Sequence, residues 1–246
     1  MKLNPVLKEG IQIYLVEGES FVVYLHYLLF LAAVECVALY LPALDAQAWR
    51  GAAYLFKVSS AACLVLAVYF TLRLANHEFA LGRLTALRHW LTREKLTLPQ
   101  LAAGQLSLLC LQAAILTLLA LPLLLWAGAI ARTAAEKVLW SIFLVLLYSL
   151  AYGVWGLLGA AWFEHRVESR QVFIRCWTIS LVGVTSLVYL PLNPVAFLLA
   201  RLEGKEFAPV IVWGWQGSVP AFHLLFHVLL FALGLAGYLW ALRREA

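Results

Sequence analysis

Residues 101–126 read LAAGQLSLLCLQAAILTLLALPLLLW, an apolar run without one charged side chain. A helix needs about 20 mainly apolar residues to cross a hydrocarbon core about 30 Å thick. Five similar stretches flank this one, at 21–41, 52–72, 138–163, 172–192 and 219–242. Their apolar residues do not alternate as barrel strands do, and only helices and closed barrels satisfy the backbone in lipid. The sequence therefore predicts an all-α polytopic membrane protein: six transmembrane helices in one domain, residues 1–246.

Charged residues are few, and the basic ones lie mainly on one side of the predicted membrane. Of the 246 residues, 64% are hydrophobic and 13% are charged. The positive-inside bias places both termini in the cytoplasm, so we expect a multi-pass protein of the inner (cytoplasmic) membrane. The net charge of +5 reflects this asymmetry and gives no reason to expect a nucleic-acid partner. On the cytoplasmic side lie 12 of the 18 basic residues: Lys2, Lys8, Arg73, Arg83, Arg88, Arg93, Lys95, Arg166, Arg170, Arg175, Arg243 and Arg244.

Residues 1–20 are predicted to form an interfacial helix before the first span. Apolar residues recur at helical spacing from Leu3 to Tyr14. Pro5 suits a first helical turn, and Asn4 can cap it. A helix with one apolar and one polar face lies in the headgroup plane, where it contacts membrane lipids. The alternative is a simple lead-in to the first span.

The longest predicted cytoplasmic connection, residues 73–98, contains a second amphipathic segment. Leu84, Leu87 and Leu91 share one helical face, and basic residues surround it. Gly82 can break or cap a helix at this point. A cytoplasmic amphipathic helix either rests on lipid or docks into the groove of a partner, and the spacing favours neither.

The predicted outer connection, residues 193–218, ends in a Trp-Gly-Trp sequence. We expect short interfacial or re-entrant helices here. In a continuous helix the two indoles could not face one membrane surface, so a break at the glycine is predicted, closing the outer end of a pathway. An aromatic belt that only anchors the chain is the alternative. The residues assigned to this outer gate or interface are Asn193, Pro194, Trp213, Gly214 and Trp215.

Two charges fall within predicted spans. Glu35 lies near the outer end of the first span and Lys57 near the outer start of the second, so both lie at a similar depth on antiparallel neighbours. Charge inside a membrane is costly and is usually paired, so an ion pair between the two is predicted, or a hydrogen-bonded cluster with Tyr54 and Tyr69. The alternatives are that Lys57 extends to the interface while Glu35 is protonated, or that these residues contact a substrate.

Candidate metal ligands are sparse. His223 and His227 lie four residues apart on one helical face, a spacing that can bind a metal or haem, but a closed zinc site needs further ligands. We therefore expect no metal site, with the two histidines as weak candidates. The sequence contains no Cys-x-x-Cys pair, so a disulfide framework is not indicated. It also contains no G-x-x-x-x-G-K-[ST] loop, so no nucleotide site is predicted in this chain.

Three stretches resemble the permease subunits of type-two ABC exporters. Asn4-Pro5-Val6-Leu7-Lys8-Glu9 resembles the opening of these subunits. The stretch from Glu78 to Leu87, followed by Leu98-Pro99 and Gly104-Gln105, is similar to a cytoplasmic pattern of the family. Pro191-Leu192-Asn193-Pro194 also resembles the family, as does the arrangement of six spans with an interfacial N-terminal helix.

The resemblance implies a transport subunit that is not itself an enzyme. Two permease chains, identical or homologous, would face each other above a cytosolic ATPase dimer that binds ATP and Mg²⁺, and this chain would bind no cofactor. A connecting helix with Asn4, Pro5, Lys8 and Glu9 would lie along the inner leaflet. A coupling helix over Glu78–Leu91 would contact the ATPase through Glu78, Gly82, Arg83, Leu84, Leu87 and Arg88. Few charges line the spans, which favours lipid-like or amphipathic cargo.

Two other functions are weighed against this one. The first is a haem- or quinone-binding redox subunit that uses His223 and His227, with His26 or tyrosines as further ligands. The second is a non-catalytic scaffold in a larger membrane complex.

Overall fold

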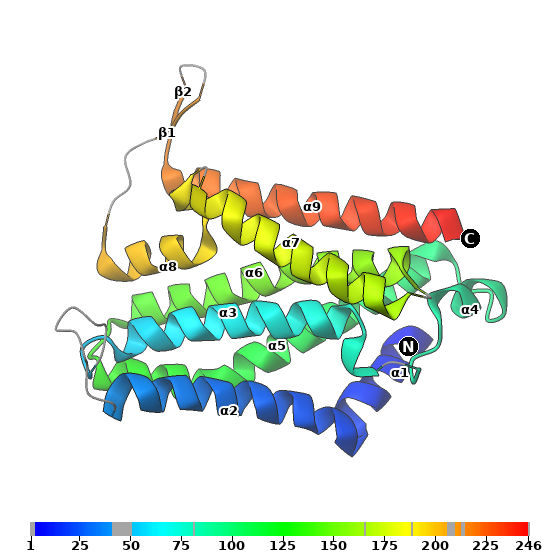
Figure 1. Ribbon diagram of the computed structural model, residues 1–246, viewed down its shortest axis with the longest axis horizontal. Coiled ribbons are helices and arrows are strands. Elements are labelled where there is room, and N and C mark those ends of the chain that lie inside the picture. Colours follow the sequence, from blue (N-terminus) through cyan, green and yellow to red (C-terminus); the bar gives the residue numbers. More distant parts are fainter. Residues whose placement is uncertain are drawn as a thin grey trace.

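The computed structural model describes residues 3–40, 51–80, 82–164, 166–187, 189–205, 210–212 and 215–245. Its long helices are α2 (Gly18–Tyr40), α3 (Leu55–Ala75), α5 (Leu98–Ile130), α6 (Ala135–Trp162), α7 (Val167–Leu187) and α9 (Val219–Glu245). Figure 1 shows them running back and forth along one long axis. Both marked termini lie at the same end of this bundle.

Five of the long helices have the length and composition of membrane spans. Within the described residues these are α2, α3, α5, α6 and α9, and they make this a multi-pass, predominantly helical membrane protein. The predicted fifth span, 172–192, is shifted in the structure: α7 begins earlier, includes Arg170 and Arg175, and ends before Pro191. A proline lacks a backbone N–H and disfavours helical geometry in the residue before it, which accounts for the early end. A sixth span at α7 stays a prediction.

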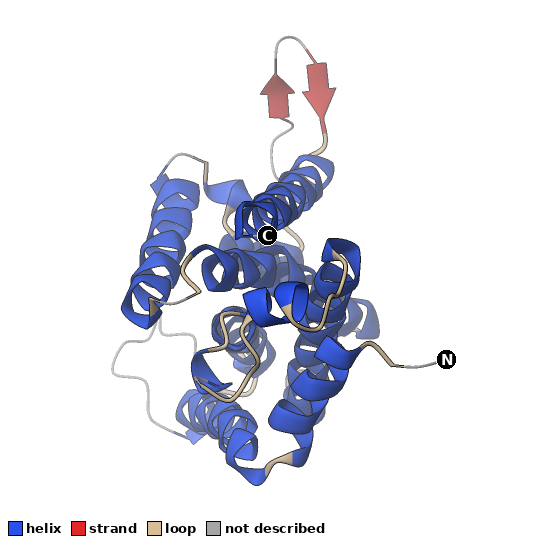
Figure 2. Cartoon of the chain, turned by 90° about the vertical axis from the view of Figure 1, so that its right-hand side faces the viewer, coloured by secondary structure: helices blue, strands red, loops and turns tan. Residues whose placement is uncertain are grey.

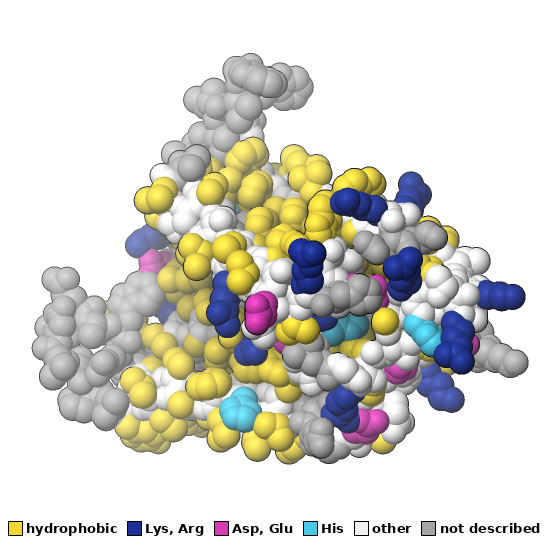
Figure 3. Space-filling model, turned by 45° about the vertical axis from the view of Figure 1, so that its right-hand side comes forward, with side chains coloured by type: hydrophobic (Ala, Val, Ile, Leu, Met, Phe, Trp, Pro, Cys, Tyr) yellow, Lys and Arg dark blue, Asp and Glu magenta, His cyan; other side chains and the backbone are white. Residues whose placement is uncertain are grey.

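The two ends of the bundle carry different elements. The terminal end carries α1 (Pro5–Ile11), α4 (Leu87–Thr92) and the last turn of α9, and Figure 2 views the molecule from this end. The hairpin end carries α8 (Pro194–Glu203) and the strands β1 (Val210–Val212) and β2 (Trp215–Gly217). On the face in Figure 3, hydrophobic side chains cover much of the bundle, while Lys and Arg gather toward the terminal end.

The outer connection is helical only in its first part. β1 and β2 pair antiparallel, with Val212 opposite Trp215, where interfacial helices were expected. The β-branched run Val210–Val212 favours a strand, which accounts for the difference. Trp213 and Gly214, on which the predicted gate depends, lie outside the described residues, as does the side chain of Trp215.

The centre of the bundle is formed by α3 and α6, which pack against each other more extensively than any other pair. The next most extensive pair is α6 with α9, and these two helices run in the same direction. Hydrogen bonds join them at a constant sequence offset of 75, as expected for parallel helices in register. We call this set of contacts the α6–α9 ladder: Tyr148 with His223, Tyr152 with His227, and Trp155 with the carbonyl of Leu230.

Candidate functional site

The N-terminal helix is attached to the bundle through its cap. Asn4 is the N-cap of α1, where its Oδ1 accepts a hydrogen bond from the N–H of Val6 at 3.0 Å, and Pro5 occupies the first turn as predicted. Asn4 Nδ2 also donates to the carbonyl of Gln100 at 2.7 Å, which joins α1 to the start of α5. A π-helical segment, Gln12–Val16, follows α1 and leads into α2. The interfacial position of this region stays a prediction.

The connection between α3 and α5 is not the single helix expected over Glu78–Leu91. A 3₁₀ turn covers Glu78–Ala80, and α4 begins only at Leu87. Between them Gly82 has φ +73°, a left-handed conformation that interrupts a helix and that suits glycine. The expected coupling helix is therefore corrected to a short turn, a glycine break and the six-residue α4.

Carboxylates hold this connection to the helices around it. Glu9 of α1 accepts hydrogen bonds from both the backbone N–H of Thr85, at 3.1 Å, and its hydroxyl, at 2.5 Å. Glu17 forms an ion pair with Arg83. At the end of α6, Glu164 accepts from the backbone N–H of Arg88 at 3.2 Å. The connection is thus joined to the N-terminal segment and to α6.

Two further contacts fix the predicted coupling residue Glu78. Its Oε2 lies 2.6 Å from Nε of Arg73, and its Oε1 accepts from Nδ2 of Asn76 at 3.3 Å. Glu78 therefore stabilises the end of α3, and its carboxylate is engaged within the chain.

The apolar face of the connection turns inward. Leu87 is 7% exposed and packs in a core cluster with Leu101 of α5, and Leu84 is half-buried. The exposed side of α4 and of the turn after it presents Arg88, Arg93 and Lys95. The exposed tip is therefore mainly basic, with the carboxylate of Glu94 between two of its cations, and the two leucines belong to the fold.

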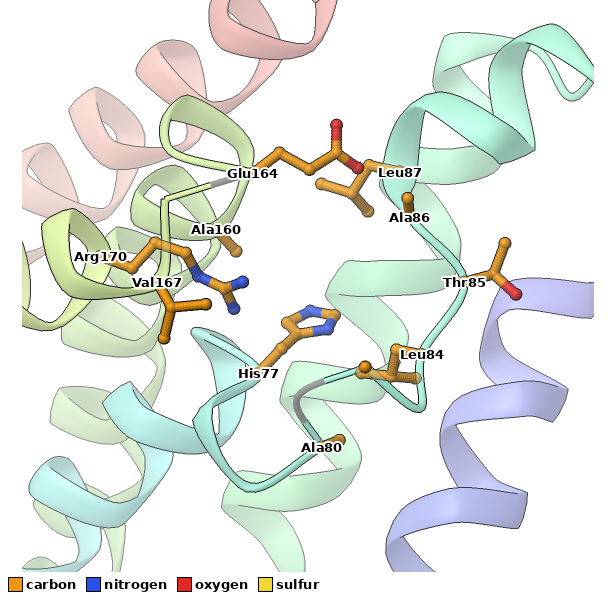
Figure 4. A pocket seen from close by; sticks show the side chains of 11 residues that line it. His77, Ala80, Leu84, Thr85, Ala86, Leu87, Ala160, Glu164, Val167 and Arg170 are labelled. Carbon is orange, nitrogen blue, oxygen red and sulfur yellow. The ribbon is translucent and has the colours of Figure 1, made fainter.

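A cavity of about 240 Å³ lies behind this connection. Figure 4 shows it between the loop with His77, Leu84 and Leu87 on one side and the α6–α7 junction with Glu164 and Arg170 on the other. The side chains of His77 and Arg170 point into the open space. Sequence reasoning did not single out this pair, because its members lie far apart in the chain.

His77 is uncharged at neutral pH. Burial, with the positive charge of Arg170 as a second cause, lowers the pKa of His77 to about 4. Its Nε2 lies 3.1 Å from Oε1 of Gln105 on α5 and donates to it in the neutral tautomer. Of the two side chains in the cavity, Arg170 is therefore the charged one.

The predicted ion pair between Glu35 and Lys57 is wrong. Lys57 Nζ lies 3.2 Å from Oε1 of Glu203 on α8. Glu35 is 2% exposed, and its carboxyl oxygens have no hydrogen-bond partner among the described residues. Similar depth on neighbouring helices was not sufficient to predict the ion pair, because α8 lies across the hairpin end and places the carboxylate of Glu203 closer to Lys57.

The predicted gate residue Asn193 acts as a helix cap. Its Oδ1 accepts from the N–H groups of Val195 and Ala196 at 3.0 and 3.1 Å, and Pro194 follows it in the first turn of α8. Asn193 Nδ2 donates to Oγ of Ser186 at 3.0 Å, near the end of α7. These bonds connect α7 to α8.

His223 and His227 are fully buried in the α6–α9 ladder. Nδ1 of His223 donates to the carbonyl of Pro191 at 2.7 Å, and Nδ1 of His227 donates to the carbonyl of His223 at 2.8 Å. Each Nε2 then accepts from a tyrosine hydroxyl, Tyr148 or Tyr152. All four ring nitrogens are engaged, and among the described residues no group of three His, Cys, Asp or Glu side chains could hold a metal.

Comparisons with family models, with curated proteins and with solved structures found no match to this chain.

Proposed function

We propose that this protein is the membrane-spanning permease subunit of an ATP-driven exporter of the inner membrane, coupled at its terminal end to a separate ATPase chain. Both termini then lie in the cytoplasm. Two copies, or this chain and a homologue, form the pathway, and an ATPase dimer binds ATP and Mg²⁺. The proposal rests on the resemblance of residues 4–9, 78–105 and 191–194 to such subunits.

The observation that best supports it is the basic tip at α4. This helix projects from the terminal end of the bundle, and Arg88, Arg93 and Lys95 are exposed on it and on the turn that follows. The bonds of Glu9 to Thr85 and of Glu164 to Arg88 join the same connection to α1 and to α6. A displacement of the tip is therefore transmitted to two parts of the bundle, as rigid-body coupling to a partner requires.

Site-specific cross-linking in the native cell tests the proposal. A photoreactive residue at Arg88 or Arg93 should cross-link to a cytosolic chain that contains a Walker sequence, identified by mass spectrometry. The matched control is Arg132, which is exposed in the turn between α5 and α6 and should not label that chain. Cross-links at the tip to proteins without an ATPase sequence would favour the scaffold function, and equal labelling from Arg132 would contradict the coupling site.

The redox alternative is disfavoured by a specific observation. The four ring nitrogens of His223 and His227 are engaged by two carbonyls and two tyrosines, so axial ligation would break the ladder. A Soret band in the purified protein would nevertheless overturn the exporter proposal in favour of a haem subunit.

A further inference from the structure

Arg170 is a buried cation in the first turn of α7, with a residue exposure of 8%. Its Nε donates to Oδ1 of Asn76 at 3.4 Å, and its Nη2 donates to the backbone carbonyl of Asn76. Within the described part of the chain, no carboxylate forms an ion pair with it. Glu78 is engaged by Arg73, and Glu164 accepts from Arg88, so both nearby carboxylates are already bonded elsewhere.

The guanidinium has donors left over for a ligand. Of its five N–H groups, two account for the bonds to Asn76, and Figure 4 shows the group directed into the cavity. A buried charge without a carboxylate in direct contact is costly, and a guanidinium presents its remaining donors in a planar fork that suits an oxyanion. The cavity is therefore suited to a small anion that contacts Arg170.

The volume of the cavity and the charges around it limit the chemical class of the ligand. The volume of about 240 Å³ is below the roughly 300–1,000 Å³ of sites for drug-sized ligands, so a phosphate with a small substituent fits better than a nucleotide. Val167, which begins α7, also lines the cavity, and the positive end of a helix dipole favours an anion. The carboxylate of Glu164 lines it too, and this negative charge disfavours a doubly charged ligand.

We propose that the cavity between residues 77–87 and the start of α7 binds a singly charged phosphate group, with the Arg170 guanidinium as its main hydrogen-bond donor. The group can come from the phosphodiester of an anionic membrane lipid or from free phosphate in solution. A bound phosphate would add a link between the α3–α4 connection and α7, beside the hydrogen bonds of Arg170 to Asn76. The site does not depend on the exporter function.

Ligand binding to the full-length protein in detergent tests the site. Thermal unfolding and native mass spectrometry are followed with three probes: dioctanoyl phosphatidylglycerol, dioctanoylglycerol, which lacks the phosphate, and inorganic phosphate. We expect phosphatidylglycerol to raise the Tm and to remain bound, and dioctanoylglycerol to do neither. If inorganic phosphate produces the same shift, the ligand is the free anion; if it does not, the ligand is the lipid headgroup.

Three variants assign any binding to this cavity. Arg170→Gln keeps a hydrogen bond to Asn76 but removes the charge, and should weaken phosphate binding about tenfold or more. Ala86→Leu adds bulk at an exposed lining position, so it blocks the cavity without altering the core. Arg175→Gln, at an exposed position of the same helix, is the matched control and should bind as the wild type does.

Several results would overturn the site. Equal shifts with dioctanoylglycerol and phosphatidylglycerol would show that only the acyl chains bind. Unchanged phosphate binding in Ala86→Leu, or a loss in Arg175→Gln as large as in Arg170→Gln, would place the binding elsewhere. If Arg170→Gln does not fold, Ala86→Leu with its Arg175→Gln control decides the question.

Discussion

At the scale of single residues, the partner of a charged side chain in a membrane helix depends on the direction of that side chain as well as on its depth. The spacing of Glu35 and Lys57 predicts a similar depth for both, yet Lys57 pairs with Glu203. Depth follows from counting residues along a helix, whereas the direction of a side chain depends on how the helices pack. A short helix from elsewhere in the chain can therefore supply the partner, and spacing on two neighbouring spans does not reveal it.

The Lys57–Glu203 pair predicts an energetic coupling that the Glu35–Lys57 combination lacks. The effects of Lys57→Met and Glu203→Gln on stability should be non-additive, because each single change already removes the shared interaction. The coupling should be about 0.5–1 kcal/mol, because the pair is partly exposed. Lys57→Met with Glu35→Gln should be additive. The measurement is a double-mutant cycle from unfolding in detergent, and a larger coupling with Glu35 than with Glu203 would contradict the assignment.

At the scale of elements, an amphipathic pattern predicts the apolar face of a helix but not which surface packs on that face. The spacing of Leu84 and Leu87 indicates a shared apolar face, and the structure turns that face toward the molecule's own core. The cavity with His77 and Arg170 could not be predicted in this way, because its lining comes from two separate connections. A signal for the α6–α9 ladder was present, since Tyr148 and Tyr152 repeat the spacing of the two histidines.

Close packing of α6 on α9 makes one glycine sensitive to substitution. A Cβ at Gly234 would lie 2.6 Å from Cγ1 of Val154 and 2.8 Å from Nε1 of Trp155, closer than real contacts allow. Gly234→Ala should therefore lower stability by about 1–3 kcal/mol through overpacking. A methyl group added at Gly183 on α7 would meet open space, so Gly183→Ala is the control and should be neutral or slightly stabilising. Equal effects of the two changes on thermal unfolding would argue against a tight α6–α9 contact.

At the scale of the whole molecule, the apolar runs predicted the spans well. Five of the six predicted stretches coincide with helices suited to crossing a membrane. These spans were predictable because about 20 apolar residues are needed for each crossing, whatever the packing. The shift of α7 and the hairpin formed by β1 and β2 were not predicted. They depend on local backbone preferences of prolines and β-branched residues, which the length of an apolar run does not show.

The topology itself can be tested by labelling. With the native cysteines replaced, a cysteine at Arg88 should react with a membrane-impermeant reagent only after the membrane is opened, because the terminal end is predicted to be cytoplasmic. A cysteine at Lys205, beyond the end of α8, should react in intact cells. Labelling of both from the same side would contradict an arrangement in which the two ends of the bundle face opposite compartments.

The α6–α9 ladder also has a consequence for the order in which the protein is made. Partners separated by 75 residues cannot meet until the ribosome has added that length of chain. At about 5–20 residues per second this takes about 4–15 s. During that interval the hydroxyls of Tyr148 and Tyr152 lack their histidine acceptors. Because α9 follows α6 in the chain, Tyr148 and Tyr152 obtain these acceptors only after His223 and His227 have been synthesised. A chain that stops before Val219 leaves those two hydroxyls without those partners.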